Sequence, residues 1–319
     1  SPLLTSAIYF ALVLVFVLNR SKILNLIGKF LTPFIVIMLL AVIGIGLSSS
    51  EFTTGISTFE TPIVTGILEG YQTFDAIGAV VVGAVIIVSL NFKNMKVEAF
   101  ESKRKLIRQS GFIAGTGLFI IYAGLISVGA YYGSEIEVNS ELSNDMQRAN
   151  LLRGISIASL GVFGNTVLSV LISLACFTTA IGIVAGTADY FRGLFHKSQT
   201  VYVVTAIIAC IAGIGVGQLD FNSIIVIAIP VLLCIYPITI VLILLNVLPE
   251  KLATSLVFRA VVLVTFLFSL PDVIGFISPL EGLKGITEFI PFSQYSLGWV
   301  LPALLAFVIT SIVQPKNRV

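Results

Sequence analysis

The chain has 319 residues, of which 57% are hydrophobic and only 11% are charged. Soluble domains carry about 25% charged residues, so this composition excludes an ordinary soluble protein and indicates an all-α, polytopic membrane protein. A net charge of +2 and three cysteines without CxxC spacing give no sign of a nucleic-acid partner, a disulfide framework or a zinc site.

Apolar runs long enough to cross a bilayer predict about nine transmembrane helices. If the first run ends in the cytoplasm, alternating connections place 15 of the 18 Lys and Arg residues inside. This asymmetry fits the rule that cytoplasmic loops are positively charged. We therefore predict a multi-pass protein of a cell membrane with a cytoplasmic C-terminus. The predicted spans are roughly 3–19, 30–48, 62–91, 110–133, 159–191, 200–217, 222–248, 254–277 and 297–314.

The third run contains two carboxylates, Glu69 and Asp75, close to Gly66 and Gly70. A carboxylate at bilayer depth costs about 2.5–3.5 kcal/mol on insertion scales. Glycines weaken the helix by about 1 kcal/mol each, so the backbone is expected to open here. A broken helix at the middle of a membrane exposes backbone groups that can bind an ion or a zwitterion.

The polar residues near this expected break have several possible roles. Thr73 can cap a new helix. Asp75 in the first turn of that helix either stabilises its N-terminus or contacts a cation or an ammonium group. Glu69 is a group for substrate, proton or cation, or the partner of another polar residue in the bundle. Tyr71 lines or gates a site, or simply packs.

A second polar cluster lies halfway along the fifth predicted span, at Thr178 and Thr179. Their hydroxyls can bond back to a carbonyl in the preceding turn, which is common in membrane helices. Alternatively, their oxygens can ligate a small hard cation such as Na⁺. The residues alone leave both interpretations open.

The motifs of common enzymes are missing from the sequence. It contains no HExxH, no P-loop GxxxxGK[ST] and no GxSxG, and His196 is its only histidine. This argues against a membrane protease or an ATP-driven machine, and we predict that the protein is not an enzyme. Pro271 and the residues up to Pro291 are assigned to an outer connection rich in breakers.

Several short stretches, in order along the chain, resemble the branched-chain amino acid:cation symporter family. The first resembles the family signature GYxT(M/F)DA, and the second resembles its AC-x-TTA-x-G stretch. They are GYQTFDAIGA at 70–79, ACFTTAIG at 175–182, IPVL at 229–232 with Tyr236-Pro237, YSL at 295–297 with Trp299, and IGK at 27–29 with LTP at 31–33.

This resemblance implies a twelve-span fold built from two inverted five-helix repeats, as in LeuT-like transporters. The nine spans would be the fourth to the twelfth: two spans of the first repeat at 1–48, the second repeat at about 62–248, and two terminal spans at about 254–314. The substrate would contact the break through Gly66, Glu69, Gly70, Tyr71, Thr73 and Asp75. Thr178 and Thr179 would ligate Na⁺, the coupling ion, and no other cofactor is expected.

The sequence and this resemblance together predict a secondary transporter of a bacterial cell membrane that imports leucine, isoleucine and valine with Na⁺. Coupling to H⁺ through Glu69 or Asp75 is the nearest alternative, since a desolvated carboxylate favours its protonated form. A channel and a non-transporting membrane protein are weaker alternatives. Because three family spans would be missing, we also expect that these 319 residues by themselves do not transport.

Overall fold

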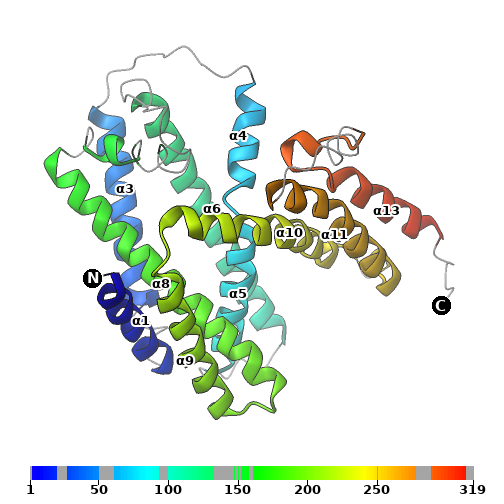
Figure 1. Ribbon diagram of the computed structural model, residues 1–319, viewed down its shortest axis with the longest axis horizontal. Helices are drawn as coiled ribbons and strands as arrows, with labels where there is room; N and C mark the ends of the chain where they lie inside the picture. Colours follow the sequence, from blue (N-terminus) through cyan, green and yellow to red (C-terminus); the bar gives the residue numbers. More distant parts are fainter. Residues whose placement is uncertain are drawn as a thin grey trace. The chain divides into compact units, whose positions relative to one another are not determined.

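The computed structural model describes residues 2–19, 27–49, 61–92, 100–132, 147, 150, 152–157, 161–249, 251–277 and 289–313. Within these residues all regular structure is helical and no strand occurs (Figure 1). The predicted all-α class is therefore confirmed for the described part of the chain. Several cations used for the topology prediction lie outside it, namely Arg20, Lys22, Lys93, Lys96, Arg148, Lys284, Lys316 and Arg318.

The helices follow one another in the order that the apolar runs predict. In chain order they are α1 (Pro2–Leu18), the π-helical turn η1 (Ile27–Leu31), α3 (Thr32–Ser49), α4 (Pro62–Tyr71), α5 (Asp75–Phe92), α6 (Phe100–Tyr132), α8 (Val162–Leu194), α9 (Gln199–Val216), α10 (Phe221–Val247), α11 (Ser255–Ile277), the 3₁₀ turn η2 (Ser293–Tyr295) and α13 (Val300–Val313).

Six segments of the described residues are long and apolar enough to cross a membrane: Gly28–Ser48, Arg104–Tyr132, Phe163–Leu194, Gln199–Val216, Ser223–Val247 and Ser255–Ile277. Helices α1 and α13 are apolar but shorter. The run at 62–91 forms two helices, α4 and α5, rather than one. This is the pattern of a polytopic helical membrane protein, whereas the count of nine spans and the inverted repeat stay predictions.

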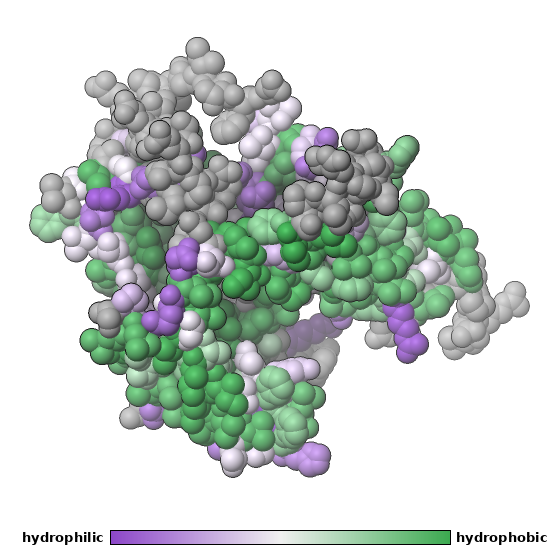
Figure 2. Space-filling view, viewed as in Figure 1, coloured by the Kyte–Doolittle hydropathy of each residue, from purple (hydrophilic) through white to green (hydrophobic). Residues whose placement is uncertain are grey.

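Large apolar side chains point outward from these helices. Phe112 in α6 and Phe163 in α8 are 76% and 80% exposed. Hydrophobic side chains cover much of the visible helical surface (Figure 2). A soluble domain buries such residues, so this surface is suited to contact with lipid chains.

The chain divides into two compact units, each described here by itself. The first comprises Leu3–Glu60 and Val82–Gly213, and the second comprises Thr61–Val81 and Ile214–Val319. Helix α5 begins in the second unit and ends in the first, so the break between α4 and α5 lies wholly within the second unit.

In the first unit, α1, α8 and α9 share a buried cluster that includes Ile181 and Tyr202. The hydroxyl of Tyr202 donates to the carbonyl oxygen of Val17 at 3.0 Å, so this buried polar group is satisfied. Gly213 of α9 lies against the ring of Phe10 in α1, where an added Cβ would collide with the ring. The close approach of these two helices therefore requires glycine.

Helices α3 and α6 form a second cluster in the same unit. Ile43 and Val128 are buried in it. The Tyr132 hydroxyl donates to the Gly46 carbonyl oxygen across the two helices at 3.2 Å. This bond joins residues 86 positions apart in the sequence and fixes the end of α6 against α3.

In the second unit, α10 packs on α11, and α11 packs on α13. Their shared core includes Val241, Val257 and Trp299. Helix α10 begins at a side-chain cap, because the carboxylate of Asp220 accepts from the backbone N–H of Ser223 at 3.1 Å. Such a cap satisfies one of the amides that have no partner at a helix start.

The predicted span at 254–277 and the predicted outer connection from Pro271 to Pro291 overlap, and the structure agrees with the span. Helix α11 continues through Pro271 and ends at Ile277, so the prediction that the connection begins at Pro271 was wrong. Proline removes one helical hydrogen bond, and membrane helices tolerate this loss. Asp272 consequently belongs to a helix that is long and apolar enough to span a membrane.

Candidate functional site

The predicted break exists, but it lies later in the chain than expected. Helix α4 ends at Tyr71 and α5 begins at Asp75. We expected the opening between Gly66 and Thr73, yet Gly66 and Gly70 are both helical residues of α4. Their lower helix propensity, about 1 kcal/mol each, does not unwind this helix, so the prediction was wrong for these two positions.

Three residues form the break, and local hydrogen bonds hold them. The backbone N–H of Gln72 donates to Leu68 O at 3.0 Å, and that of Thr73 donates to Gly70 O at 3.3 Å. Phe74 adopts the left-handed conformation, with φ of 54°. Non-glycine residues pay about 1–2 kcal/mol for this conformation. The turn therefore needs contacts from elsewhere to hold it.

The predicted capping role of Thr73 is not what the structure shows. Its hydroxyl donates to the carbonyl oxygen of Gly70 at 2.8 Å, at the C-terminal end of α4. Asp75 lies in the first turn of α5, as expected, where the helix dipole favours a carboxylate. The side chains of Glu69, Thr73 and Asp75 are all exposed.

An aromatic cluster supplies the contacts that hold the break. The ring of Tyr236 in α10 packs edge-on against Tyr71 and Phe74, with centroid distances of 5.0 and 5.1 Å. On another side, the indole N–H of Trp299 donates to the Tyr71 hydroxyl at 3.2 Å. Tyr71 thus contacts two residues that lie 165 and 228 positions later in the sequence. Tyr236 and Trp299 lie in stretches that resembled the family, but sequence reasoning gave them no role.

Thr178 and Thr179 are brought together in α8. Both hydroxyls donate to the same acceptor, the carbonyl oxygen of Ala175, each at 2.9 Å. This is the back-bonded arrangement that membrane helices commonly adopt. A hydroxyl that donates its proton keeps acceptor lone pairs, so both oxygens remain able to ligate a cation. These threonines belong to the first unit, and the α4–α5 break belongs to the second.

The glycine of the same α8 stretch has a packing role. An added Cβ on Gly182 would lie 3.3 Å from the Cγ2 atom of Val82 in α5. A methyl group there would press on the neighbouring helix. The stretch at 175–182 thus places two hydroxyls one turn before a close contact between α8 and α5.

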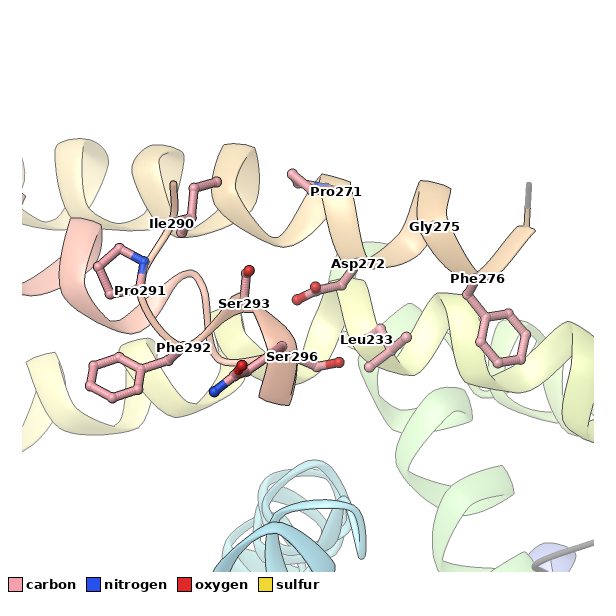
Figure 3. Close-up of a pocket in the computed structure, with 11 residues that line it drawn as sticks. Leu233, Pro271, Asp272, Gly275, Phe276, Ile290, Pro291, Phe292, Ser293 and Ser296 are labelled. Atoms are coloured by element: carbon pink, nitrogen blue, oxygen red, sulfur yellow. The ribbon is translucent and has the colours of Figure 1, made fainter. Parts of the chain in front are cut away.

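Sequence reasoning missed Asp272. This carboxylate lines a cavity of about 690 Å³ in the second unit, between α10, α11 and the turn that contains η2 (Figure 3). The predicted span at 254–277 contains Asp272, and a carboxylate within a span was the signal that could have identified it. Among the described residues no group of three or more His, Cys, Asp or Glu could hold a metal ion.

Comparison with known proteins places these features in a family. The family described as "Branched-chain amino acid transport protein" matches residues 2–317. The chain is similar to the branched-chain amino acid transport system 2 carrier protein of Pseudomonas aeruginosa, with 31% identity over 98% of this chain and 70% of the relative. It is also similar to branched-chain amino acid permease BraB of Bacillus subtilis, with 30% identity over 100% of this chain and 72% of the relative.

A third relative has similar coverage. Branched-chain amino acid permease BrnQ of Corynebacterium glutamicum is 29% identical over 95% of this chain and 67% of the relative. No solved structure matches the chain. Carriers and permeases are transport proteins rather than enzymes, which agrees with the absence of enzyme motifs. The family match and the 31% identity together show that this chain belongs to the branched-chain amino acid transport protein family.

Proposed function

We propose that this protein imports leucine, isoleucine and valine across the cell membrane together with Na⁺. The observation that carries the proposal is the interruption between α4 and α5, in a chain whose relatives are named branched-chain amino acid carriers and permeases. A helix that stops within a membrane span leaves two opposed helix ends, and such ends form the binding sites of many secondary transporters.

The chemistry of the break suits an aliphatic zwitterion. The C-terminal end of α4 carries a partial negative charge and, with Glu69 and Asp75 close by in sequence, favours an ammonium group. The N-terminal end of α5 carries a partial positive charge, which favours a carboxylate. The rings of Tyr71 and Phe74 offer apolar surface to a branched side chain. An apolar pocket separates neighbouring aliphatic side chains by only about 1–3 kcal/mol per methylene, so one carrier for all three amino acids is expected.

Coupling to Na⁺ rests on Thr178 and Thr179. Their two oxygens converge on one carbonyl in α8, and hydroxyl and carbonyl oxygens are ligands for hard cations. A cation bound there would favour one conformation of the carrier, and a substrate that favours the same conformation would bind more tightly. This reciprocal effect is what symport requires.

The test is uptake of labelled isoleucine into vesicles that contain the polypeptide as its gene encodes it, with an inward gradient of Na⁺ or of choline. We expect that isoleucine uptake requires Na⁺ and that leucine and valine inhibit it competitively. Thr179→Val should raise the Na⁺ concentration for half-maximal uptake at least about tenfold, which corresponds to about 1.4 kcal/mol. Thr239→Val is the matched control, because Thr239 makes the same 2.9 Å bond to the carbonyl four residues earlier in α10.

Other outcomes would change the assignment. Uptake that follows a pH gradient regardless of Na⁺ would move coupling to Glu69 or Asp75, and Glu69→Gln would then test the first of these. Equal Na⁺ dependence in Thr179→Val and Thr239→Val would contradict a Na⁺ site in α8. The absence of isoleucine uptake under either gradient would contradict the proposed substrate.

A further inference from the structure

The cavity beside Asp272 is formed by elements that the proposed transport site does not use. Its described lining comes from α10, the end of α11 and the turn at 290–296. Its volume of about 690 Å³ is within the range of about 300–1,000 Å³ that is usual for small-molecule sites. None of its described lining residues belongs to the α4–α5 break.

Asp272 gives this cavity a negative charge that no other described lining residue compensates. It is the only charged residue among the described residues that line the cavity. Its side chain is half-buried, and no described residue makes a hydrogen bond or an ion pair with its carboxylate. Partial burial removes part of the water around a carboxylate, which disfavours its charged form. A cation in the cavity would offset this cost.

The opposite wall of the cavity carries neutral polar groups on a turn of fixed shape. Ser293, Gln294 and Ser296 all line it. The turn is bounded by two left-handed residues, Phe292 with φ of 67° and Ser296 with φ of 56°. Backbone bonds close it, including Ser296 N–H to Ser293 O at 3.0 Å. The amide of Gln294 and the hydroxyl of Ser296 are donors that suit a second, anionic group of a ligand.

The remaining walls are apolar. Leu233 of α10, Phe276 of α11 and Ile290 line the cavity with hydrocarbon side chains. In Figure 3 the Asp272 carboxylate points into the space between α11 and the turn, toward Ser293. One wall therefore attracts a cation, and others can bury an aliphatic chain. This combination fits an aliphatic ammonium compound better than a bare metal ion.

We propose that this cavity is a second ligand site, separate from the α4–α5 break, which binds an aliphatic amino acid through an ion pair between its ammonium group and Asp272. Only the choice of amino acid rests on the proposed function.

The experiment measures binding of three probes to the purified chain in detergent. Isopentylamine keeps the ammonium group and carbon skeleton of leucine, 4-methylpentanoate keeps the skeleton and the carboxylate, and leucine has all three. Trp299 is the only tryptophan in the sequence. It lies three residues after Ser296 and also donates to Tyr71 at the break, so its fluorescence reports binding at either site and the variants below assign the signal to one of them. Equilibrium dialysis of labelled isopentylamine gives the affinity independently.

We expect saturable binding of isopentylamine and leucine and none of 4-methylpentanoate. Asp272→Asn should weaken isopentylamine binding at least tenfold. Gly275→Leu is a second variant that keeps the carboxylate and fills the cavity: Gly275 lines it, and a Cβ there meets open space. It should have the same effect. Asp189→Asn makes the same change in α8 of the first unit, and its affinity for isopentylamine should stay within twofold of that of the unaltered chain.

Asp75→Asn separates this proposal from the transport site. This substitution should reduce isoleucine uptake and leave the affinity for isopentylamine within twofold of that of the unaltered chain. If isopentylamine does not bind saturably, or if Asp272→Asn and Gly275→Leu both bind it normally, the proposal is overturned. Loss of binding in Asp75→Asn with retention in Asp272→Asn also overturns it, because the amine then binds at the break. Binding as expected, without any isoleucine uptake by the polypeptide as its gene encodes it, would refute the proposed function and leave this second site intact.

Discussion

The hydrogen bond between Trp299 and Tyr71 gives a quantitative test of what holds the α4–α5 break. Trp299 is only 6% exposed, and its indole N–H donates to the Tyr71 hydroxyl at 3.2 Å. Tyr71→Phe removes the acceptor and leaves a buried donor without this partner. Such a loss costs about 1–3 kcal/mol, so the free energy of unfolding should fall by about that amount.

A double-mutant cycle isolates the contribution of this pair. Trp299→Phe removes the donor and also loses packing, so its single effect is larger than that of the hydrogen bond. With both substitutions together, the loss should be smaller than the sum of the two single losses by about 0.5–1.5 kcal/mol, the net value of one hydrogen bond. Circular dichroism during denaturant titration in detergent measures all four proteins.

Tyr295→Phe is the control for this cycle. Tyr295 lies in η2 and makes no side-chain hydrogen bond with the described residues, so its substitution should change stability by less than about 0.5 kcal/mol. If the Tyr71 and Trp299 substitutions add within about 0.3 kcal/mol, the bond does not hold the break, and the reasoning from its geometry fails.

Two further predictions concern helix packing and capping. Gly213→Ala should destabilise the protein by about 1–3 kcal/mol, because its Cβ would strike the ring of Phe10; Gly215→Ala, which meets open space, should be neutral or stabilising by up to about 1 kcal/mol. Equal thermal midpoints for the two variants would contradict the close approach of α1 and α9. Asp220→Ala should cost about 1 kcal/mol by removing the cap of α10, whereas Asp220→Asn should keep most of the stability. Denaturant titration would refute this role if the two substitutions cost the same.

The helices and the existence of a break could be predicted from the sequence because both depend on local composition. Apolar runs specify the spans, and polar residues within one run mark the interruption. The position of the break depends instead on distant residues. Phe74 adopts a left-handed conformation next to Tyr236, and no local pattern at 62–91 indicates that contact. Glycine propensity therefore suggested Gly66 and Gly70, while long-range aromatic packing accompanies the opening at 72–74.

The candidate site shows the same division. The sequence identified Thr178 and Thr179 as a pair and offered the back-bond as one interpretation, and the structure shows that bond. The cavity could not be predicted, because Leu233, Asp272 and Ser293 come from three separate segments. Only folding brings them together.

The length of α8 has a consequence for the bilayer around it. Its 33 residues rise about 50 Å at 1.5 Å per residue, whereas the hydrocarbon core is about 30 Å thick. The stretch before its first charged residue runs from Val162 to Ala188 and rises about 40 Å, so an upright α8 would extend this stretch roughly 10 Å beyond the core and hydrophobic mismatch favours a tilted helix. Thr178 and Thr179 lie near the middle of α8, and the tilt that a given lipid thickness imposes would set the direction from which the proposed Na⁺ approaches their hydroxyls.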